Sequence, residues 1–244
     1  MKQPYLFTTV AVLASLLFIG SEVLAQGDVP RYEIGGQFSL LSRNKPSTQF
    51  KDSGFEEFFV GYIAQPGFGP RFTYNLTNHI ALEGEGNFFP ERHDENDFGV
   101  PSGQIYQGQF GIKAGKRFKK MGLFIKGRPG FITFTKVSQF TGFRTITAIH
   151  PFTRVPVQIE NPEFRIGKAT YFSTDLGGVV EFYPSRRLVT RFDIGDTIIR
   201  YGTYREPLSI VCPGVQPFCI PPVFERPAET KHNLQFSAGI GIRF

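Results

Sequence analysis

Residues 236–244 read Phe-Ser-Ala-Gly-Ile-Gly-Ile-Arg-Phe, a stretch in which apolar side chains alternate with polar or small ones. The alternation begins earlier: across residues 232–244, Asn233, Gln235 and Arg243 occupy odd positions, and the large apolar residues occupy even positions. Successive side chains of a strand point to opposite faces of a sheet. The stretch therefore predicts a strand with one apolar and one polar face.

The same alternation occurs in seven earlier runs. Each is about 9 to 15 residues long, which is enough for a tilted strand to cross a bilayer. The composition, with 28 Phe, 9 Tyr and no Trp, favours an all-β protein, because aromatic and β-branched residues are enriched in strands. The runs are residues 32–42, 67–75, 80–90, 104–118, 123–134, 169–183 and 188–201.

The connections between the eight runs alternate between short and long. The short ones are residues 76–79, 119–122 and 184–187, and the long ones are residues 43–66, 91–103, 135–168 and 202–231. Antiparallel neighbours place all short connections at one end, an asymmetry typical of outer-membrane barrels. We predict an all-β, eight-stranded antiparallel up-and-down transmembrane β-barrel with three short periplasmic turns and four long external loops. The long connection 135–168 alternates too, as would a hairpin that continues the barrel, either as a display surface or as a stiff rim.

The N-terminus has the pattern of a secretory signal peptide. Lys2 supplies the positive charge, residues 6–20 are apolar, and Val23 and Ala25 occupy the small-residue positions before a cut. The apolar run is shorter than the ~20 residues of a spanning helix, which disfavours a membrane anchor. We predict that residues 1–25 are a cleaved signal peptide and that residues 26–244 form the barrel domain.

Together these features resemble the small eight-stranded outer-membrane barrels, the family of OmpA-like and OmpX-like porin-fold proteins. The resemblance covers nearly all of residues 26–244 and implies a place in the outer membrane, among its lipid and lipopolysaccharide. The terminal strand looks like the signal read by the outer-membrane assembly machinery, which implies that role for Phe236, Ile240, Ile242 and Phe244. The alternative is a secreted soluble barrel, in which the apolar face of each strand points inward.

The polar residues at alternate positions of the strands predict a charged barrel interior. An eight-stranded barrel is just wide enough for side chains to fill it, and charges held away from water must be paired. The network is either a salt-bridge plug or the lining of a small-solute channel. The short turns place Arg71 opposite Glu85 and Glu181 opposite Arg191, and barrel closure brings Arg243 near Glu33. The predicted lumen charge network is Glu33, Arg71, Glu83, Glu85, Lys113, Arg117, Lys126, Arg128, Asp175, Glu181, Arg191, Asp193 and Arg243.

The chain offers few residues for catalysis. The histidines are His79, His93, His150 and His232, and no His-x-Ser pair occurs. No zinc-ligand spacing or phosphate-binding glycine loop is found, so we predict no catalytic residue, no metal and no cofactor. A lipid A-modifying enzyme is the least favoured of the alternatives.

Two further features bear on partners. Cys212 and Cys219 lie in a Pro-rich segment, and an exported protein can join them by a disulfide, either to staple the loop or to stiffen a displayed knob. The net charge is +6, with bases in residues 116–120 and at Arg186 and Arg187. We expect these bases to reach lipid phosphates and expect no nucleic-acid binding, because no continuous basic face is interleaved with aromatic residues. The sequence identifies no extracellular partner for the long loops.

Overall fold

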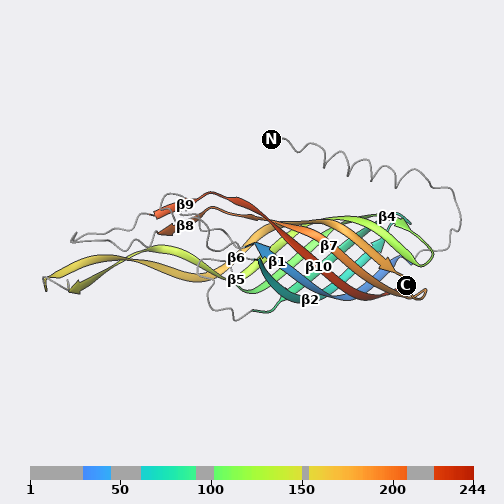
Figure 1. Cartoon of the computed structure of the whole chain (residues 1–244), viewed down its shortest axis with the longest axis horizontal. Coiled ribbons are helices and arrows are strands. Elements are labelled where there is room, and N and C mark those ends of the chain that lie inside the picture. The colour runs from blue at the N-terminus through green and yellow to red at the C-terminus, as the bar shows by residue number, and fades with distance from the viewer. Residues whose placement is uncertain (1–29, 45–61, 92–101, 150–153, 208–222) are drawn as a thin grey trace.

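The computed structural model describes residues 30–44, 62–91, 102–149, 154–207 and 223–244 (Figure 1). Within these ranges no helix is long and apolar enough to cross a membrane. The strands are β1 (Tyr32–Asn44), β2 (Tyr62–Asn75), β3 (Ile80–Phe89), β4 (Ser102–Arg117), β5 (Met121–Ile149), β6 (Pro156–Phe182), β7 (Leu188–Tyr201), β8 (Tyr204–Pro207), β9 (Val223–Arg226) and β10 (Glu229–Arg243).

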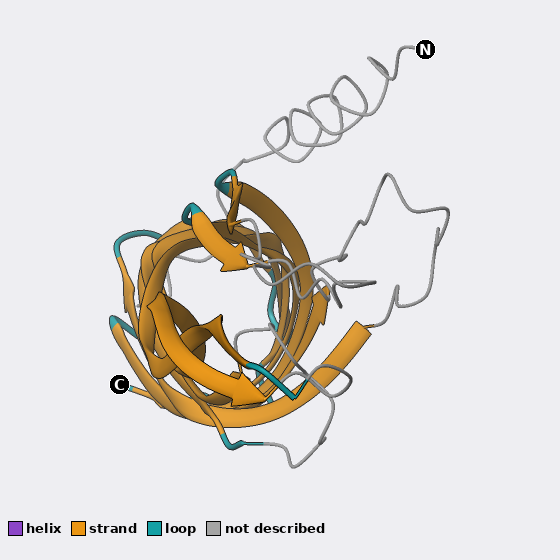
Figure 2. Ribbon diagram, turned by 90° about the vertical axis from the view of Figure 1, so that its left-hand side faces the viewer, coloured by secondary structure: helices purple, strands orange, loops and turns teal. Residues whose placement is uncertain are grey.

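Eight of these strands close into a barrel in the order β1-β10-β7-β6-β5-β4-β3-β2. Figure 2 looks nearly along the barrel and shows the strands as a ring. Every neighbouring pair is antiparallel, and β8 and β9 form a separate two-stranded sheet. The predicted all-β, eight-stranded antiparallel barrel is confirmed.

The terminal stretch 236–244 forms one side of the seam that closes the barrel. β10 pairs with β1 from Glu33↔Arg243 to Ser42↔Leu234. Beyond this ladder, Tyr32 and Phe244 exchange two backbone hydrogen bonds of 3.0 Å, and their rings stack with centroids 5.9 Å apart. The seam is therefore continued to Phe244 by both backbone and side chains.

Tight turns join β2 to β3, β4 to β5 and β6 to β7. In the last of them, the Ser185 hydroxyl accepts hydrogen bonds from the backbone amides of Arg187 (3.3 Å) and Leu188 (3.1 Å). Hydroxyl groups stabilise turns in this way because they replace a missing backbone acceptor. The three turns lie at one end of the barrel, which we call the short-turn end. The predicted registers Arg71↔Glu85, Glu181↔Arg191 and Glu33↔Arg243 are those observed.

The connection 135–168 is not the long loop that its length suggested. β5 and β6 run on past the barrel as a hairpin, paired from Gln139↔Arg165 to Ile149↔Pro156, which we call the ribbon. Figure 1 shows it extending away from the barrel at the end opposite the short turns. Its alternating residues satisfy the strand pattern, which is why the hairpin alternative is the correct one. The connections 43–66 and 91–103 fall largely outside the described residues, and the described half of 202–231 contains β8, β9 and the start of β10.

Candidate functional site in the barrel interior

The barrel wall has its polar face inside and its apolar face outside. On the interior face, the side chains of Lys113 and Arg191 are fully buried, whereas on the exterior face Phe110 is 61% exposed and Ile125 is 57% exposed. A soluble barrel has the opposite distribution, because burying charge and exposing large apolar side chains to water both cost free energy. Of the residues predicted for the lumen charge network, all thirteen face the interior and all are buried except Arg117, which is partly buried.

Arg191 is the centre of the charged interior. Its Nη2 lies 2.9 Å from Glu83 Oε2, and its Nε lies 2.8 Å from Asp193 Oδ2. Its cross-strand neighbour Glu181 is farther, with Oε1 at 3.6 Å from Nη1. The predicted register is right, but Arg191 lies closer to Glu83 on the opposite wall and to Asp193 on its own strand than to its cross-strand neighbour.

Lys113 joins two carboxylates that Arg191 also contacts. Its Nζ lies 3.2 Å from Glu83 Oε1 and forms an ion pair with Glu181. Glu181 also accepts a hydrogen bond of 2.8 Å from the Tyr183 hydroxyl, which lies just beyond β6. Burial and the neighbouring carboxylate raise the pKa of Tyr183 well above its ordinary value. This phenol therefore stays a donor at physiological pH.

Arg128 and Lys126 bind the next group of carboxylates along the barrel. Arg128 Nη2 lies 2.5 Å from Asp175 Oδ2, and Nη1 pairs with Glu85. Lys126 Nζ lies 2.7 Å from Asp175 Oδ2 and 3.4 Å from Asp193 Oδ1. Every base of this group contacts more than one acid, so these ion pairs form one connected network rather than separate bridges.

Arg71 does not have its expected cross-strand partner as its nearest contact. It lies opposite Glu85 in the register, yet its Nη1 donates to Gln37 Oε1 at 3.4 Å and lies 4.0 Å from Asp193 Oδ2. The interior is crowded enough that partners are shared among strands.

Arg243 and Glu33, brought together by barrel closure, likewise bond elsewhere. Arg243 Nη2 donates to the carbonyl oxygen of Ser185 at 3.2 Å and its guanidinium lies 4.2 Å from the centroid of the Tyr183 ring. Glu33 Oε1 accepts from Asn75 Nδ2 at 3.0 Å. Arg243 therefore holds the β6–β7 turn at the short-turn end.

A layer of amide side chains lies beyond the charges. Gln107 Nε2 donates to Gln235 Oε1 at 3.0 Å, a bond between β4 and β10, which lie opposite each other in the ring. Asn87 donates to Gln107 at 3.0 Å and accepts from Gln37 at 3.0 Å. The predicted network of charges did not include this layer, although its residues occupy the same inward-facing alternate positions.

An apolar layer lies nearer the ribbon. The alternating pattern did not predict this layer. Its signal in the sequence is that the inward-facing positions change from polar to apolar near the end of several strands. Its members are at most 5% exposed and pack together inside the barrel rather than on its outer face. They are Leu41, Phe89, Ile105, Ile132, Phe134, Val137 and Ile199.

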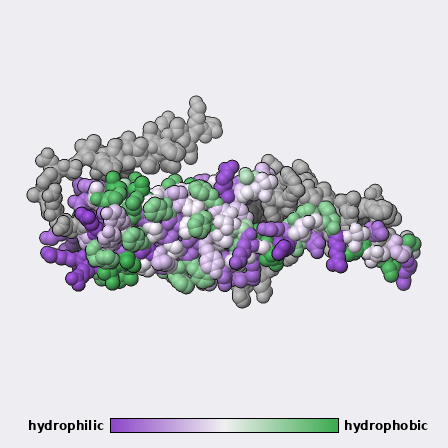
Figure 3. Space-filling model, turned by 180° about the vertical axis from the view of Figure 1, so that it is seen from behind, coloured by the Kyte–Doolittle hydropathy of each residue, from purple (hydrophilic) through white to green (hydrophobic). Residues whose placement is uncertain are grey.

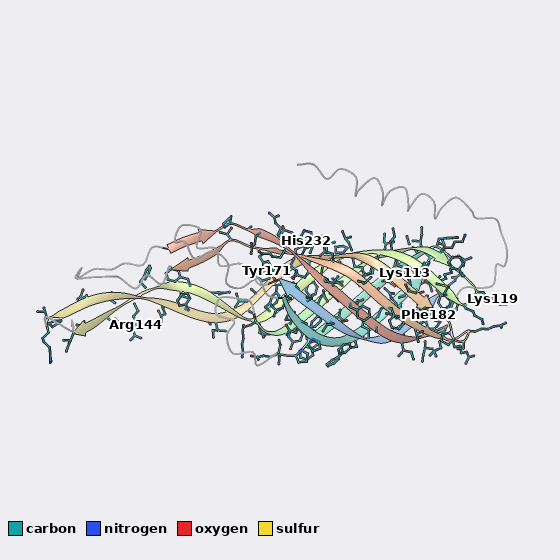
Figure 4. All side chains as sticks on the ribbon, in the orientation of Figure 1. Lys113, Lys119, Arg144, Tyr171, Phe182 and His232 are labelled. Atoms are coloured by element: carbon teal, nitrogen blue, oxygen red, sulfur yellow. The ribbon has the colours of Figure 1, made fainter. Side chains whose placement is uncertain are left out.

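The remaining candidate residues are scattered. His79 lies in the β2–β3 turn, whereas His232 lies on the outer face of β10 near the other end, with Nδ1 2.6 Å from Asp196 Oδ2 (Figure 4). No group of three or more His, Cys, Asp or Glu that could hold a metal is found in the described part of the chain. His93, His150, Cys212 and Cys219 lie outside the described residues.

The four residues assigned to the assembly signal all face outward from β10 and its end. Their exposed fractions are 42% for Phe236, 53% for Ile240, 58% for Ile242 and 61% for Phe244. An apolar row on the outer face of the last strand is available to another protein or to lipid.

Solved structures of small outer-membrane barrels are similar to this chain, as the sequence resemblance predicted. Neisserial surface protein A is 9% identical over 87% of this chain and 97% of its own, with a TM-score of 0.44. OprG, an outer membrane protein of Pseudomonas aeruginosa, is 12% identical over 88% and 96%, with a TM-score of 0.42. Ail, the attachment invasion locus protein of Yersinia pestis, is 12% identical over 88% and 97%, with a TM-score of 0.40. No family model and no curated protein matches the chain.

Proposed function

We propose that this chain is an integral outer-membrane barrel without enzymatic activity, with a closed lumen and a structural or surface-interaction role carried by its external part. The observation that carries the proposal is the inverted burial of the barrel wall. A belt of exposed Phe, Leu and Ile side chains surrounds a core of buried charges, and only an apolar solvent outside makes both favourable.

The orientation follows from the two unlike ends. Outer-membrane barrels turn their short connections to the periplasm and their long ones outward. The tight turns at residues 76–79, 118–120 and 183–187 would then face the periplasm, and the ribbon would project from the cell. Export by the N-terminal signal and recognition of the last strand by the assembly machinery belong to this proposal.

Three successive layers support a closed lumen. Passage along the axis would have to break the ion-pair network around Arg191, then the amide layer, and then the apolar layer around Phe134. A narrow apolar constriction also opposes the passage of ions, since it does not replace their hydration. The channel alternative is therefore the second choice.

The ribbon supports a role at the surface. Phe140 lies 5.1 Å from Phe143 and 6.0 Å from Phe164 between ring centroids, and neighbouring Ile166 is 69% exposed. Clustered apolar side chains outside the membrane-facing belt commonly mark a protein-interaction site. We infer that an extracellular partner binds there.

Cell fractionation tests the proposal. The full chain, expressed with its N-terminus, should appear in the outer-membrane fraction as a heat-modifiable band, folded and compact until boiled. Recovery as a soluble periplasmic protein would overturn it in favour of a secreted barrel. Mass spectrometry of lipid A with and without the protein tests the enzyme alternative, which predicts a lost or added acyl chain.

A further inference from the structure

The short-turn end carries a cluster of exposed bases that the proposed function does not use. Lys119 and Lys120 lie in the β4–β5 turn, Arg186 and Arg187 lie in the β6–β7 turn, and all four are exposed. We propose that these residues, here called the basic turn cluster, form a binding site for anionic phospholipid headgroups in the periplasmic leaflet. The inference rests on the proposed membrane position.

The fold brings the two turns together. β5 and β6 are neighbours paired up to Met121↔Phe182, so the turn before β5 and the turn after β6 lie side by side. The backbone amide of Tyr183 donates to the carbonyl oxygen of Lys120 at 2.9 Å, which links them directly. Figure 4 labels Lys119 and Phe182 at this same end.

Both turns are held by internal bonds. Phe118 N donates to Met121 O at 2.7 Å, and the Ser185 hydroxyl accepts two backbone amides of its own turn. Arg243 Nη2 reaches the carbonyl oxygens of Ser185 at 3.2 Å and Arg186 at 3.4 Å from inside the barrel. A site whose backbone is already ordered loses less entropy when a ligand binds.

Within the described residues, no Asp or Glu side chain pairs with the cluster. Two acidic side chains at this end, Glu33 and Glu181, point into the barrel, where Glu33 accepts from Asn75 and Glu181 pairs with Lys113. None of the four bases forms an ion pair in the described part of the chain. Positive charge that is not balanced from within favours an anionic partner.

Apolar residues next to the cluster select a lipid rather than a soluble anion. Phe118, within the β4–β5 turn, is 46% exposed, and Phe182 and Phe192, on the outer face of β6 and β7 near the turns, are 42% and 45% exposed. Phe182 and Phe192 pack edge-on with centroids 6.3 Å apart. Figure 3, with this end at the left, shows hydrophilic residues at the tip and hydrophobic residues beside them. Bases beside apolar surface at a membrane edge match a phosphate headgroup with its acyl chains.

The test uses a fluorescent reporter at the site. The chain has no Trp, so a Phe182→Trp variant has one emitter. The variant is refolded in phosphatidylcholine vesicles containing a minor fraction of phosphatidylglycerol, and either lipid is supplied with brominated chains that quench Trp. We expect quenching by brominated phosphatidylglycerol several-fold above its bulk fraction, falling at high salt because screening weakens headgroup attraction.

Two charge-matched variants provide the comparison. Changing the cluster to K119Q/K120Q/R186Q/R187Q should return quenching to the bulk fraction. The control R144Q/R154Q/R165Q/K168Q, in and beside the ribbon, should leave the enrichment unchanged, and so should added inorganic phosphate.

The outcomes separate this inference from the proposed function. Quenching by brominated phosphatidylcholine without preference for phosphatidylglycerol would overturn the lipid site and leave the membrane position intact. Absence of quenching by either lipid would overturn the membrane position itself. Displacement by inorganic phosphate would assign the cluster to soluble phosphate instead.

Discussion

Arg191 and Glu83 bond to each other across the full width of the barrel. Arg191 is on β7 and Glu83 is on β3, strands that lie opposite each other in the ring, and Arg191 Nη2 is 2.9 Å from Glu83 Oε2. Both side chains are fully buried. Their contact joins two opposite walls of the barrel. We therefore expect it to contribute more to the free energy of unfolding than an ion pair between adjacent strands.

Removing either partner should destabilise the barrel strongly. Arg191→Ala or Glu83→Ala leaves a buried charge with too few partners, at a cost of about 3–5 kcal/mol each. The double change should cost clearly less than the sum, because the two residues act as a pair. Urea unfolding in detergent or lipid, followed by the heat-modifiable band, measures all three.

The exposed pair Lys136–Glu91 is the control. These side chains are 51% and 30% exposed, and exposed ion pairs contribute at most about 1 kcal/mol. Lys136→Ala and Glu91→Ala should therefore shift the unfolding midpoint little. Equal, additive effects at the two sites would show that the interior pair is also solvated.

Conductance should require damage to all three layers that close the lumen. Wild-type barrel in a planar bilayer should give no discrete current, and Arg191→Ala alone should give none, because the apolar layer remains. Combining Arg191→Ala with Gln107→Ala, Phe134→Ala and Phe89→Ala removes side chains from all three layers and should produce current steps. Steps from the wild-type barrel would favour the channel alternative.

The ribbon should be dispensable for folding. Replacing residues 140–164 with Asn-Gly joins the paired residues Gln139 and Arg165 by a two-residue hairpin turn. The shortened chain should keep its heat-modifiable band, because the interior network lies entirely within the barrel. Any binding of cells to a surface or partner that depends on the full chain should be lost. A shortened chain that fails to fold would show that the ribbon is needed for folding, and would contradict its assignment to binding alone.

Phe244 should matter for assembly. Its deletion removes both the terminal aromatic residue and the last hydrogen bonds of the seam with Tyr32, so we expect less protein in the outer membrane and more in periplasmic aggregates. Phe131→Ala, which removes an exposed ring away from the seam, serves as the control and should assemble normally. Normal assembly after deletion of Phe244 would argue against both roles.

Period-2 alternation, the lengths of the connections and the resemblance to small outer-membrane barrels were together enough to predict the barrel, its closure and the register across the short turns. Glu181↔Arg191 could be read from the sequence, because a tight turn leaves little freedom in pairing. The partnership of Arg191 with Glu83 could not, because it joins residues from opposite walls and depends on the barrel's width. Nor could the apolar layer around Phe134, since inward apolar residues look like irregularities in an alternating pattern.

The central claim is that one face of each strand meets lipid and the other meets the closed interior. Ile125 and Phe124 are adjacent on β5, with Ile125 57% exposed on the outer face and Phe124 5% exposed inside. Because the chain has no Trp, Ile125→Trp and Phe124→Trp each introduce a single emitter. In vesicles with brominated lipid chains, we predict strong quenching of the Ile125→Trp variant and weak quenching of the Phe124→Trp variant. Equal quenching of the two, or stronger quenching at position 124, would contradict the account.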